Sequence, residues 1–149
     1  MMSTFTQILY QIIYSTKNRE PVLLQPHRSR IFSYMAGIIQ NKNCHVYIIN
    51  GVEDHIHIVT SLHPGISLSN FVKDLKIGTS YFIKNEKLIP NFHGWQEGYG
   101  GFTYSMNDRQ NLIDYVKGQE EHHKKVTFLE EYMSILKEHD IQFDEKYLL

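Results

Sequence analysis

The sequence predicts an α+β domain of the ferredoxin-like βαββαβ type: an antiparallel sheet with two helices on one face and additional C-terminal helices. Stretches rich in β-branched and aromatic residues alternate with stretches whose apolar residues recur at helical spacing. Their order is strand, helix, strand, strand, helix, strand. Because both strand–helix–strand crossovers are expected to be right-handed, the two helices should share one face of the sheet and leave the other open.

The first half of the chain supplies three of the strands and one helix. Residues 5–15, "FTQILYQIIYS", are typical of a strand and end at the polar turn "KNRE". A helix is predicted over residues 28–42, where apolar residues recur at helical spacing: Ile31, Met35, Ile38 and Ile39. Residues 44–50 and 55–62 are predicted to be two strands, and "NGVED" supplies the turn of their hairpin.

The second half supplies the other helix of the pair, the fourth strand and two further helices. A helix is predicted over residues 67–85, and a strand over residues 101–106 follows a Gly-rich stretch. Two more helices are expected over residues 108–125 and 128–139. The predicted buried side of the first of these three helices consists of Leu68, Phe71, Val72, Leu75, Tyr81 and Phe82.

Length and composition are typical of one domain over residues 1–149. The chain has 42% hydrophobic residues, and its single cysteine, Cys44, cannot form an internal disulfide. No apolar run approaches the roughly 18 residues that span a bilayer. The start of the chain also lacks the features of a secretory signal, so we expect a cytoplasmic protein without a membrane partner.

The net charge of −1 is unevenly distributed along the chain. Residues 126–149 contain two Lys and six acidic residues, whereas residues 1–125 contain 13 Lys and Arg and 10 acidic residues. The balance argues against a protein that coats nucleic acid by bulk attraction. A modestly basic body can still bind a phosphate backbone locally.

In "EDHIHIV", residues 53–59, two histidines flank one isoleucine. Because side chains two apart on a strand share a face, His55 and His57 should point together, away from the two helices. The pair could bind one cation, although such pairs also arise as hydrogen-bonded or surface residues. Glu53 and Asp54 are expected to be turn residues at the strand entry, with a further metal ligand or the orientation of an imidazole as the alternatives.

The predicted helix over residues 108–125 carries residues that could complete a metal site. Tyr115, Gln119 and His122 lie at positions i, i+4 and i+7 and share one stripe. If this helix lies over the open sheet face, Gln119 offers an oxygen beside the two imidazoles. Two nitrogens and one amide oxygen, with positions left for phosphate oxygens, suit Mg²⁺ or Mn²⁺. A surface role remains the alternative for Tyr115 and Gln119.

The "HIH" motif, the "YVKGQ" spacing and the continuation "EEHHKKVTFLEEYMSILKEHDIQFDEKYLL" resemble the single-tyrosine HUH transposases of bacterial insertion sequences, of the two-hundred and six-oh-five type. The resemblance covers nearly the whole chain, including "IYSTKNR" and "GYGGFTYSM". One departure is Gly118, where the family commonly has Asn. Glycine costs about 1 kcal/mol relative to alanine inside a helix, so it is expected to loosen the helix between Tyr115 and Gln119.

The resemblance implies an enzyme, a DNA strand transferase with single-strand endonuclease and ligase activity. His55, His57 and Gln119 would bind the Mg²⁺ or Mn²⁺ ion, and Tyr115 would form a covalent 5′-phosphotyrosine intermediate. It further implies single-stranded DNA with hairpin ends as the substrate and a homodimer as the active unit. In such a dimer the tyrosine of one chain can serve the histidine pair of the other.

Several other residues could contact the DNA. His122 and His123 are expected to contact phosphate or to end a solvated helix, rather than to bind metal. Aromatic residues of the Gly-rich segment could stack an unpaired base, although closure of the core edge is favoured: Phe92, Trp95 and Tyr99. The predicted backbone contacts, for which solvated surface is the alternative, are Lys17, Arg19, Arg28, Arg30, Lys73 and Lys76, with Lys84 and Lys87.

Other functions stay open at this point. One is a metal-dependent DNA phosphodiesterase or nuclease in which a metal-bound water replaces Tyr115. Another is a non-catalytic nucleic-acid-binding module, since ferredoxin-like sheets also bind RNA, although "HIHIV" stands where stacking aromatics would be expected. A domesticated relative that no longer mobilises an element is a third alternative.

Overall fold

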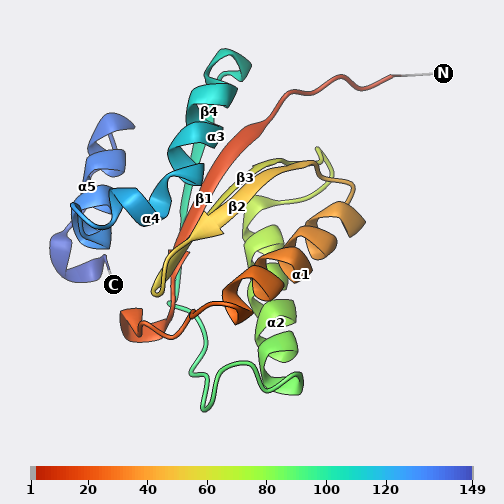
Figure 1. Ribbon diagram of the computed structural model, residues 1–149. Helices are drawn as coiled ribbons and strands as arrows, with labels where there is room; N and C mark the ends of the chain where they lie inside the picture. Colours follow the sequence, from red (N-terminus) through yellow and green to blue (C-terminus); the bar gives the residue numbers. More distant parts are fainter. Residues whose placement is uncertain (1–2, 149) are drawn as a thin grey trace.

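The computed structural model describes residues 3–148 and contains a four-stranded sheet between two groups of helices (Figure 1). Short 3₁₀ turns occur at Lys17–Arg19, Met106–Asp108 and Glu145–Tyr147. The strands and helices, in chain order, are β1 (Leu9–Ser15), α1 (His27–Asn41), β2 (Val46–Gly51), β3 (His55–Ser61), α2 (Leu68–Asn85), β4 (Gly100–Tyr104), α3 (Arg109–Lys117), α4 (Gln119–His122) and α5 (Phe128–Glu138).

The sheet has the strand order β2-β3-β1-β4, and every neighbouring pair is antiparallel. In the register, His57 lies opposite Ile13 of β1 and opposite Asn50 of β2. The predicted ferredoxin-like βαββαβ arrangement is therefore confirmed. It places β3, with both histidines, in the interior of the sheet.

Helices α1 and α2 cover one sheet face. Ile12 and Tyr14 of β1 and Ile56 and Ile58 of β3 point toward these helices and are fully buried. They pack against buried residues of α1 and α2, including Ile31, Met35, Ile39, Phe71 and Leu75. This layer forms the main hydrophobic core, and it leaves the alternate side chains of β1 and β3 for the opposite face.

Helices α3, α4 and α5 lie on that opposite face (Figure 1). Val59 packs with Leu112 and Val116 of α3, while Phe102 of β4 packs with Tyr132 of α5. Helices α3 and α5 thus each bury an apolar stripe against one half of the sheet, whereas the buried residue of α4 is Gln119. The polar site described below lies between these two clusters.

The boundaries of the first strand and of the third predicted helix differ from expectation. Strand β1 begins at Leu9 rather than at residue 5, because Ser61 and Tyr104, the residues opposite Leu9, end the pairing on both sides. The single helix predicted over residues 108–125 is wrong. It divides into α3 and α4 at Gly118, whose backbone leaves helical geometry at φ −88° and ψ 16°.

The buried side of α2 also departs from the prediction in its second half. Tyr81 is 68% exposed, and Phe82 is only half-buried. The buried positions there are Thr79 and Ile83, which continue the helical period from Phe71 and Leu75. Among the described residues, no helix is long and apolar enough to cross a membrane.

Candidate metal and tyrosine site

His55 and His57 point from β3 toward α3–α5, and both are fully buried. They share this face because they are two residues apart on a strand, while Ile56 and Ile58 fill the core on the other side. The centroids of the two rings are 5.2 Å apart. The sheet therefore holds two imidazoles side by side in a site shielded from water.

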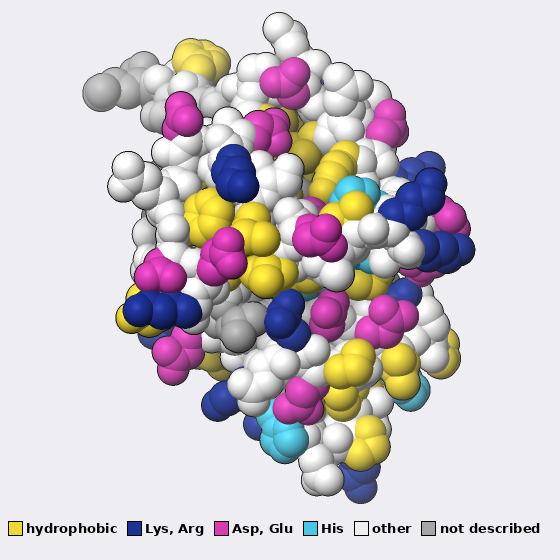
Figure 2. Space-filling model, turned by 90° about the vertical axis from the view of Figure 1, so that its left-hand side faces the viewer, with side chains coloured by type: hydrophobic (Ala, Val, Ile, Leu, Met, Phe, Trp, Pro, Cys, Tyr) yellow, Lys and Arg dark blue, Asp and Glu magenta, His cyan; other side chains and the backbone are white. Residues whose placement is uncertain are grey.

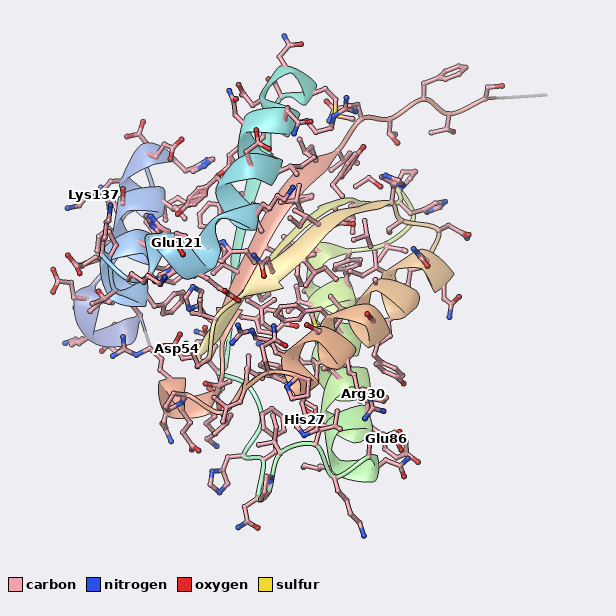
Figure 3. The ribbon with its side chains drawn as sticks, viewed as in Figure 1. His27, Arg30, Asp54, Glu86, Glu121 and Lys137 are labelled. Carbon is pink, nitrogen blue, oxygen red and sulfur yellow. The ribbon has the colours of Figure 1, made fainter. Side chains whose placement is uncertain are left out.

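The Nδ1 atom of each imidazole is held by a neighbouring side chain. His55 Nδ1 lies 2.7 Å from Oδ1 of Asp54, and His57 Nδ1 lies 2.7 Å from Oε1 of Gln11. Both partner oxygens are acceptors, so each Nδ1 donates its proton and each Nε2 is directed into the site. Asp54 therefore lies in the turn, as expected, and also orients an imidazole, one of its two alternative roles. Figure 3 labels Asp54 in the β2–β3 turn.

Tyr115 and Gln119 reach the same site from α3 and α4. Oε1 of Gln119 lies 3.4 Å from Nε2 of His55, and the Gln119 side chain is fully buried. The centroid of the Tyr115 ring lies 6.1 Å from that of His57. The two side chains stay on the same side of the chain despite the break at Gly118. Tyr115 lies beside His57 of its own chain.

Glu131 of α5 is the residue at the site that the sequence reasoning missed. Its Oε1 atom is 2.9 Å from Nε2 of His57 and 3.4 Å from Nε2 of His55. Its Oε2 atom accepts a hydrogen bond from the Tyr115 hydroxyl and another, of 3.0 Å, from Nε2 of Gln119. One carboxylate therefore contacts both histidines, the tyrosine and the glutamine.

A signal for Glu131 was present in the sequence. Phe128, Tyr132 and Ile135 form the buried stripe of α5, and Glu131 occupies the i+3 position of that same stripe. Since Glu is almost never fully buried unless paired, an acidic residue inside an apolar stripe indicates a buried functional or paired carboxylate.

The structure also corrects the interpretation of His123. Its side chain is only 9% exposed, and its Nε2 lies 3.1 Å from Nε2 of His55 and 3.0 Å from Oε1 of Glu131. It therefore belongs to the buried cluster rather than to a solvated helix end. His122 is half-buried, with Nε2 3.3 Å from Oε2 of Glu131 and 3.5 Å from the Tyr115 hydroxyl.

The ionisable groups of the site strongly influence one another. Burial alone would raise the pKa of Glu131, but hydrogen bonds from the imidazoles outweigh it and hold that pKa far below its usual value. Burial lowers the pKa of His57 despite the opposing effect of Glu131. Burial, followed by the contact with Glu131, raises the pKa of Tyr115 well above its usual value of 10. The phenol is therefore protonated in this arrangement.

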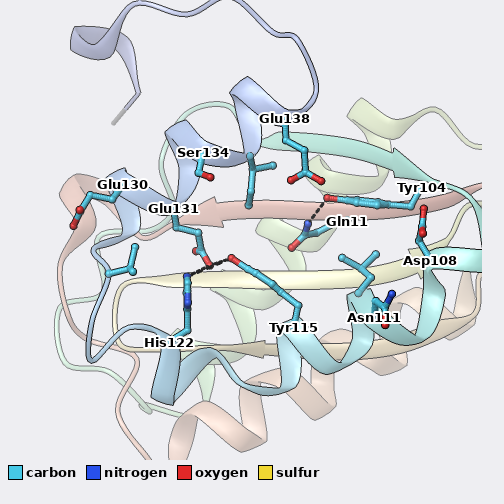
Figure 4. A pocket seen from close by; sticks show the side chains of 13 residues that line it. Gln11, Tyr104, Asp108, Asn111, Tyr115, His122, Glu130, Glu131, Ser134 and Glu138 are labelled. Carbon is cyan, nitrogen blue, oxygen red and sulfur yellow. Dashed lines mark hydrogen bonds and ion pairs between the residues drawn. The ribbon is translucent and has the colours of Figure 1, made fainter.

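A cavity of about 580 Å³ opens beside the cluster (Figure 4). Tyr115, His122 and Glu131 form one side of it, and Gln11 and Tyr104 line another part. His55 and His57 are fully buried and are not among the residues that line this cavity. A ligand in the cavity could therefore contact Tyr115, but not the two histidines.

The basic residues proposed for DNA contact are placed unequally. Arg28 is 4% exposed, donates to the Leu23 carbonyl at 2.9 Å and forms a 2.8 Å ion pair with Glu120, so its location argues against a phosphate contact. Lys76 is half-buried and donates to two backbone carbonyls. Arg30 pairs with Glu86 at 3.1 Å near the ends of α1 and α2 (Figure 3).

The remaining basic candidates are at least partly accessible. Arg19 is half-buried, and the exposed ones are Lys17, Lys73, Lys84 and Lys87. On the side of the molecule that carries α5, basic and acidic side chains are interspersed (Figure 2).

The aromatic residues of the Gly-rich segment close the edge of the core. Phe92 and Trp95 are buried there and pack edge to face, with ring centroids 5.3 Å apart, and Tyr99 is half-buried against the same cluster. The favoured interpretation, closure of the core edge, holds for Phe92 and Trp95.

A family model of the type "Transposase IS200 like" matches residues 4–119, which is most of the chain. The chain belongs to this transposase family. The ISDra2 transposase TnpA of Deinococcus radiodurans is 25% identical over 118 residues, which cover 76% of this chain and 84% of that protein. The transposase for insertion sequence element IS200 of Salmonella typhimurium is 27% identical over 121 residues, 77% of this chain and 78% of that protein.

Two solved structures share the fold of this IS200-like transposase. One is a Deinococcus radiodurans protein solved as a candidate transposase, with a TM-score of 0.60, 19% identity, and coverage of 80% of this chain and 96% of that one. The other is a REP-associated tyrosine transposase bound to a REP hairpin, with a TM-score of 0.61, 15% identity, and coverage of 84% and 76%. At these identities the likeness establishes the fold alone.

Proposed function

We propose that this family member cleaves and rejoins single-stranded DNA at the ends of an insertion sequence through a covalent 5′-phosphotyrosine intermediate. Tyr115 is the proposed nucleophile, and His55, His57 and Gln119 are the proposed ligands of Mg²⁺ or Mn²⁺. The observation that carries the proposal is that one carboxylate, Glu131, contacts both the Tyr115 hydroxyl and the two strand histidines beside a cavity. The family matches and the position of Gln119 give further support.

The side chains fit a divalent cation. Three imidazole nitrogens and a carboxylate oxygen, those of His55, His57, His123 and Glu131, lie within 4.8 Å of one another. The acceptors on Nδ1 of His55 and His57 leave their Nε2 atoms available as ligands. When bound, the ion would polarise the scissile phosphate and offset its developing charge.

Tyr115 needs its surroundings in order to act as a nucleophile. A phenol with a raised pKa attacks poorly, and here the Tyr115 hydroxyl donates to Glu131. Glu131 therefore holds the hydroxyl at the cavity wall and is the acceptor nearest to its proton. Attack on the phosphate would conserve the energy of the broken bond in the phosphotyrosine ester, so that rejoining by a DNA 3′-hydroxyl needs no ATP.

The proposed partner is single-stranded DNA with hairpin ends. The structurally similar REP-associated transposase was solved with a hairpin, which supports this substrate class. The proposed backbone contacts are the accessible basic residues Lys17, Arg19, Arg30 and Lys73. A homodimer is the proposed active unit, in which a tyrosine could also serve the partner chain.

The proposal is tested with a fluorescent single-stranded oligonucleotide that copies the DNA flanking the coding region and carries its label 3′ of the cleavage site. With Mg²⁺, the wild type should form a labelled protein adduct that survives denaturation. Tyr115→Phe should abolish the adduct, whereas Tyr81→Phe, at an exposed position of α2, should leave it unchanged.

The same assay separates the alternative functions. Cleavage that proceeds without an adduct and persists in Tyr115→Phe would identify a metal-dependent nuclease and overturn the proposal. The non-catalytic module on an open sheet is not supported, because α3–α5 cover the sheet face of His57.

A further inference from the structure

Glu131 carries a buried charge, but it is not among the proposed metal ligands His55, His57 and Gln119. Its side chain is 1% exposed, and burial of a carboxylate costs several kcal/mol unless close partners stabilise it. Its position in the apolar stripe of α5, between Phe128 and Tyr132, would suit an apolar residue. Packing of the helix therefore does not explain a carboxylate at this position.

The two oxygens of Glu131 face different groups. Oε1 lies 2.9 Å from Nε2 of His57 and 3.0 Å from Nε2 of His123, and it is also the oxygen nearest to His55. Oε2 instead accepts hydrogen bonds from Tyr115 and Gln119. Oε1 thus faces the imidazoles of His55, His57 and His123, whereas Oε2 faces the nucleophile and the amide and also lies 3.3 Å from Nε2 of His122. Figure 4 shows Glu131 beside Tyr115 and His122.

When their rings are neutral, His55 and His57 have no Nε2 proton to donate to Oε1. Asp54 and Gln11 already accept the Nδ1 protons of His55 and His57, so a neutral ring presents only a lone pair at Nε2. A lone pair directed at a carboxylate oxygen is repelled. Neutral His123 can donate its Nε2 proton to Oε1, but His55 and His57 can donate to it only as charged rings, and their centroids are 5.2 Å apart. A divalent cation would instead attract all of these lone pairs at once.

We propose that Glu131 binds, through Oε1, the divalent ion that His55 and His57 bind. This inference rests on the proposed function, which places an ion there. Adjacent ligands of Mg²⁺ lie about 3 Å apart and opposite ligands about 4.2 Å apart, given bonds of roughly 2.1 Å. The ligand atoms of the cluster lie within 4.8 Å of one another, so small shifts would suffice. Through Oε2, Glu131 then connects the ion to Tyr115.

The test measures Mn²⁺ binding to metal-free full-length protein by calorimetry. Mn²⁺ is the probe because it accepts imidazole together with carboxylate ligands. The variants are His57→Ala and Glu131→Gln, with Glu138→Gln as the matched control. Glu138 is an exposed residue of the same helix, and it lines the same cavity. We expect at least a tenfold loss of affinity in Glu131→Gln and wild-type affinity in Glu138→Gln.

The pattern across these variants separates the two hypotheses. Unchanged Mn²⁺ affinity in His57→Ala would overturn the metal site of the proposed function itself. A loss in His57→Ala combined with wild-type affinity in Glu131→Gln would overturn only the role of Glu131.

An infrared difference spectrum on addition of Mn²⁺ distinguishes ligation from mere positioning of the histidines. Ligation should shift carboxylate stretching bands in the wild type and in Glu138→Gln, and the shift should be absent in Glu131→Gln. An identical shift in Glu131→Gln would contradict the proposal. If Glu131→Gln fails to fold, Glu131→Asp keeps the charge but withdraws the oxygen by one methylene. If Glu131→Asp bound Mn²⁺ with wild-type affinity, the proposed role of Glu131 would be overturned. Reduced Mn²⁺ affinity in this variant would support the role.

Discussion

His57 and Gln11 meet across strands β1 and β3, with Nδ1 of the imidazole 2.7 Å from Oε1 of the amide. Both side chains are buried. The Gln11 amide is itself oriented, because its Nε2 donates to the Tyr104 hydroxyl at 2.9 Å. Burial raises the pKa of Tyr104 to about 12, so that hydroxyl remains neutral at physiological pH. The orientation of His57 thus depends on a chain of hydrogen bonds that begins on β4.

Gln11→Leu should weaken both the fold and Mn²⁺ binding. The substitution leaves Nδ1 of His57 buried without an acceptor, which costs about 1–3 kcal/mol of unfolding free energy. It also releases the ring from its orientation, for which we expect a 10–100-fold loss of Mn²⁺ affinity. Urea unfolding and calorimetry measure the two effects.

Gln7→Leu is the control for this prediction, because Gln7 is exposed just before β1. The control should change the unfolding free energy by less than about 0.5 kcal/mol and should leave Mn²⁺ affinity unchanged. If Gln11→Leu and Gln7→Leu had the same unfolding free energy and the same Mn²⁺ affinity, the Gln11–His57 contact would not stabilise the site.

Mn²⁺ affinity should fall in acid. Burial alone would lower the pKa of His55, but its contacts with Asp54 and Glu131 outweigh burial and raise that pKa above 6.5. Because only the unprotonated Nε2 binds a metal, Mn²⁺ must displace a proton below this pKa. For one displaced proton the affinity falls about tenfold per pH unit.

Asp54→Asn tests the cause of this pH dependence. The asparagine oxygen still accepts from Nδ1 of His55, but the negative charge that raises the pKa of that imidazole is lost. The pH at which Mn²⁺ affinity begins to fall should therefore move to a lower value. An unchanged onset in calorimetric titrations between pH 5.5 and 8, at steps of roughly half a unit, would show that Asp54 does not control His55.

Arg28→Met should destabilise the fold without changing the salt dependence of DNA binding. The substitution leaves the Leu23 carbonyl without its buried donor and removes the ion pair with Glu120, for about 1–3 kcal/mol of unfolding free energy. Arg30→Met, which removes an exposed pair with Glu86, should cost about 0–1 kcal/mol. A reduction of about one in the slope of log affinity against log salt for Arg28→Met would instead identify a phosphate contact.

The fold and part of the site could be predicted from the sequence, because they depend on the spacing of residues within one strand or one helix. The alternation of His55 with Ile56 determines which face the imidazole occupies, and helical spacing brings Tyr115 near Gln119. The contact of Glu131 with His57 at 2.9 Å joins residues 74 positions apart on separate elements. The residue pattern within α5 predicts that Glu131 is buried, but it does not predict which strand side chain Glu131 contacts. Arg28 illustrates the same limit, because its burial depends on a partner 92 positions away.

The break between α3 and α4 should not require a glycine. Gly118 has a negative φ, and a Cβ atom there would meet nothing nearer than the Asp114 carbonyl oxygen at 3.6 Å. Gly118→Ala should therefore raise the free energy of unfolding by about 0.4–1 kcal/mol, because alanine restricts the unfolded chain. Since Tyr115 and Gln119 keep their positions, Mn²⁺ affinity should be unchanged.

Gly100→Ala provides the contrast, because its new Cβ would lie 2.7 Å from Cε1 of Tyr132 and 2.8 Å from Cε2 of Phe102. These rings pack β4 against α5, so the strand or the helix must shift, at a cost of about 1–3 kcal/mol. In both thermal and urea unfolding, the free energy of unfolding should therefore rise for Gly118→Ala and fall for Gly100→Ala. If Gly118→Ala also destabilised the protein or weakened Mn²⁺ binding, the placement of Gln119 would depend on the glycine itself.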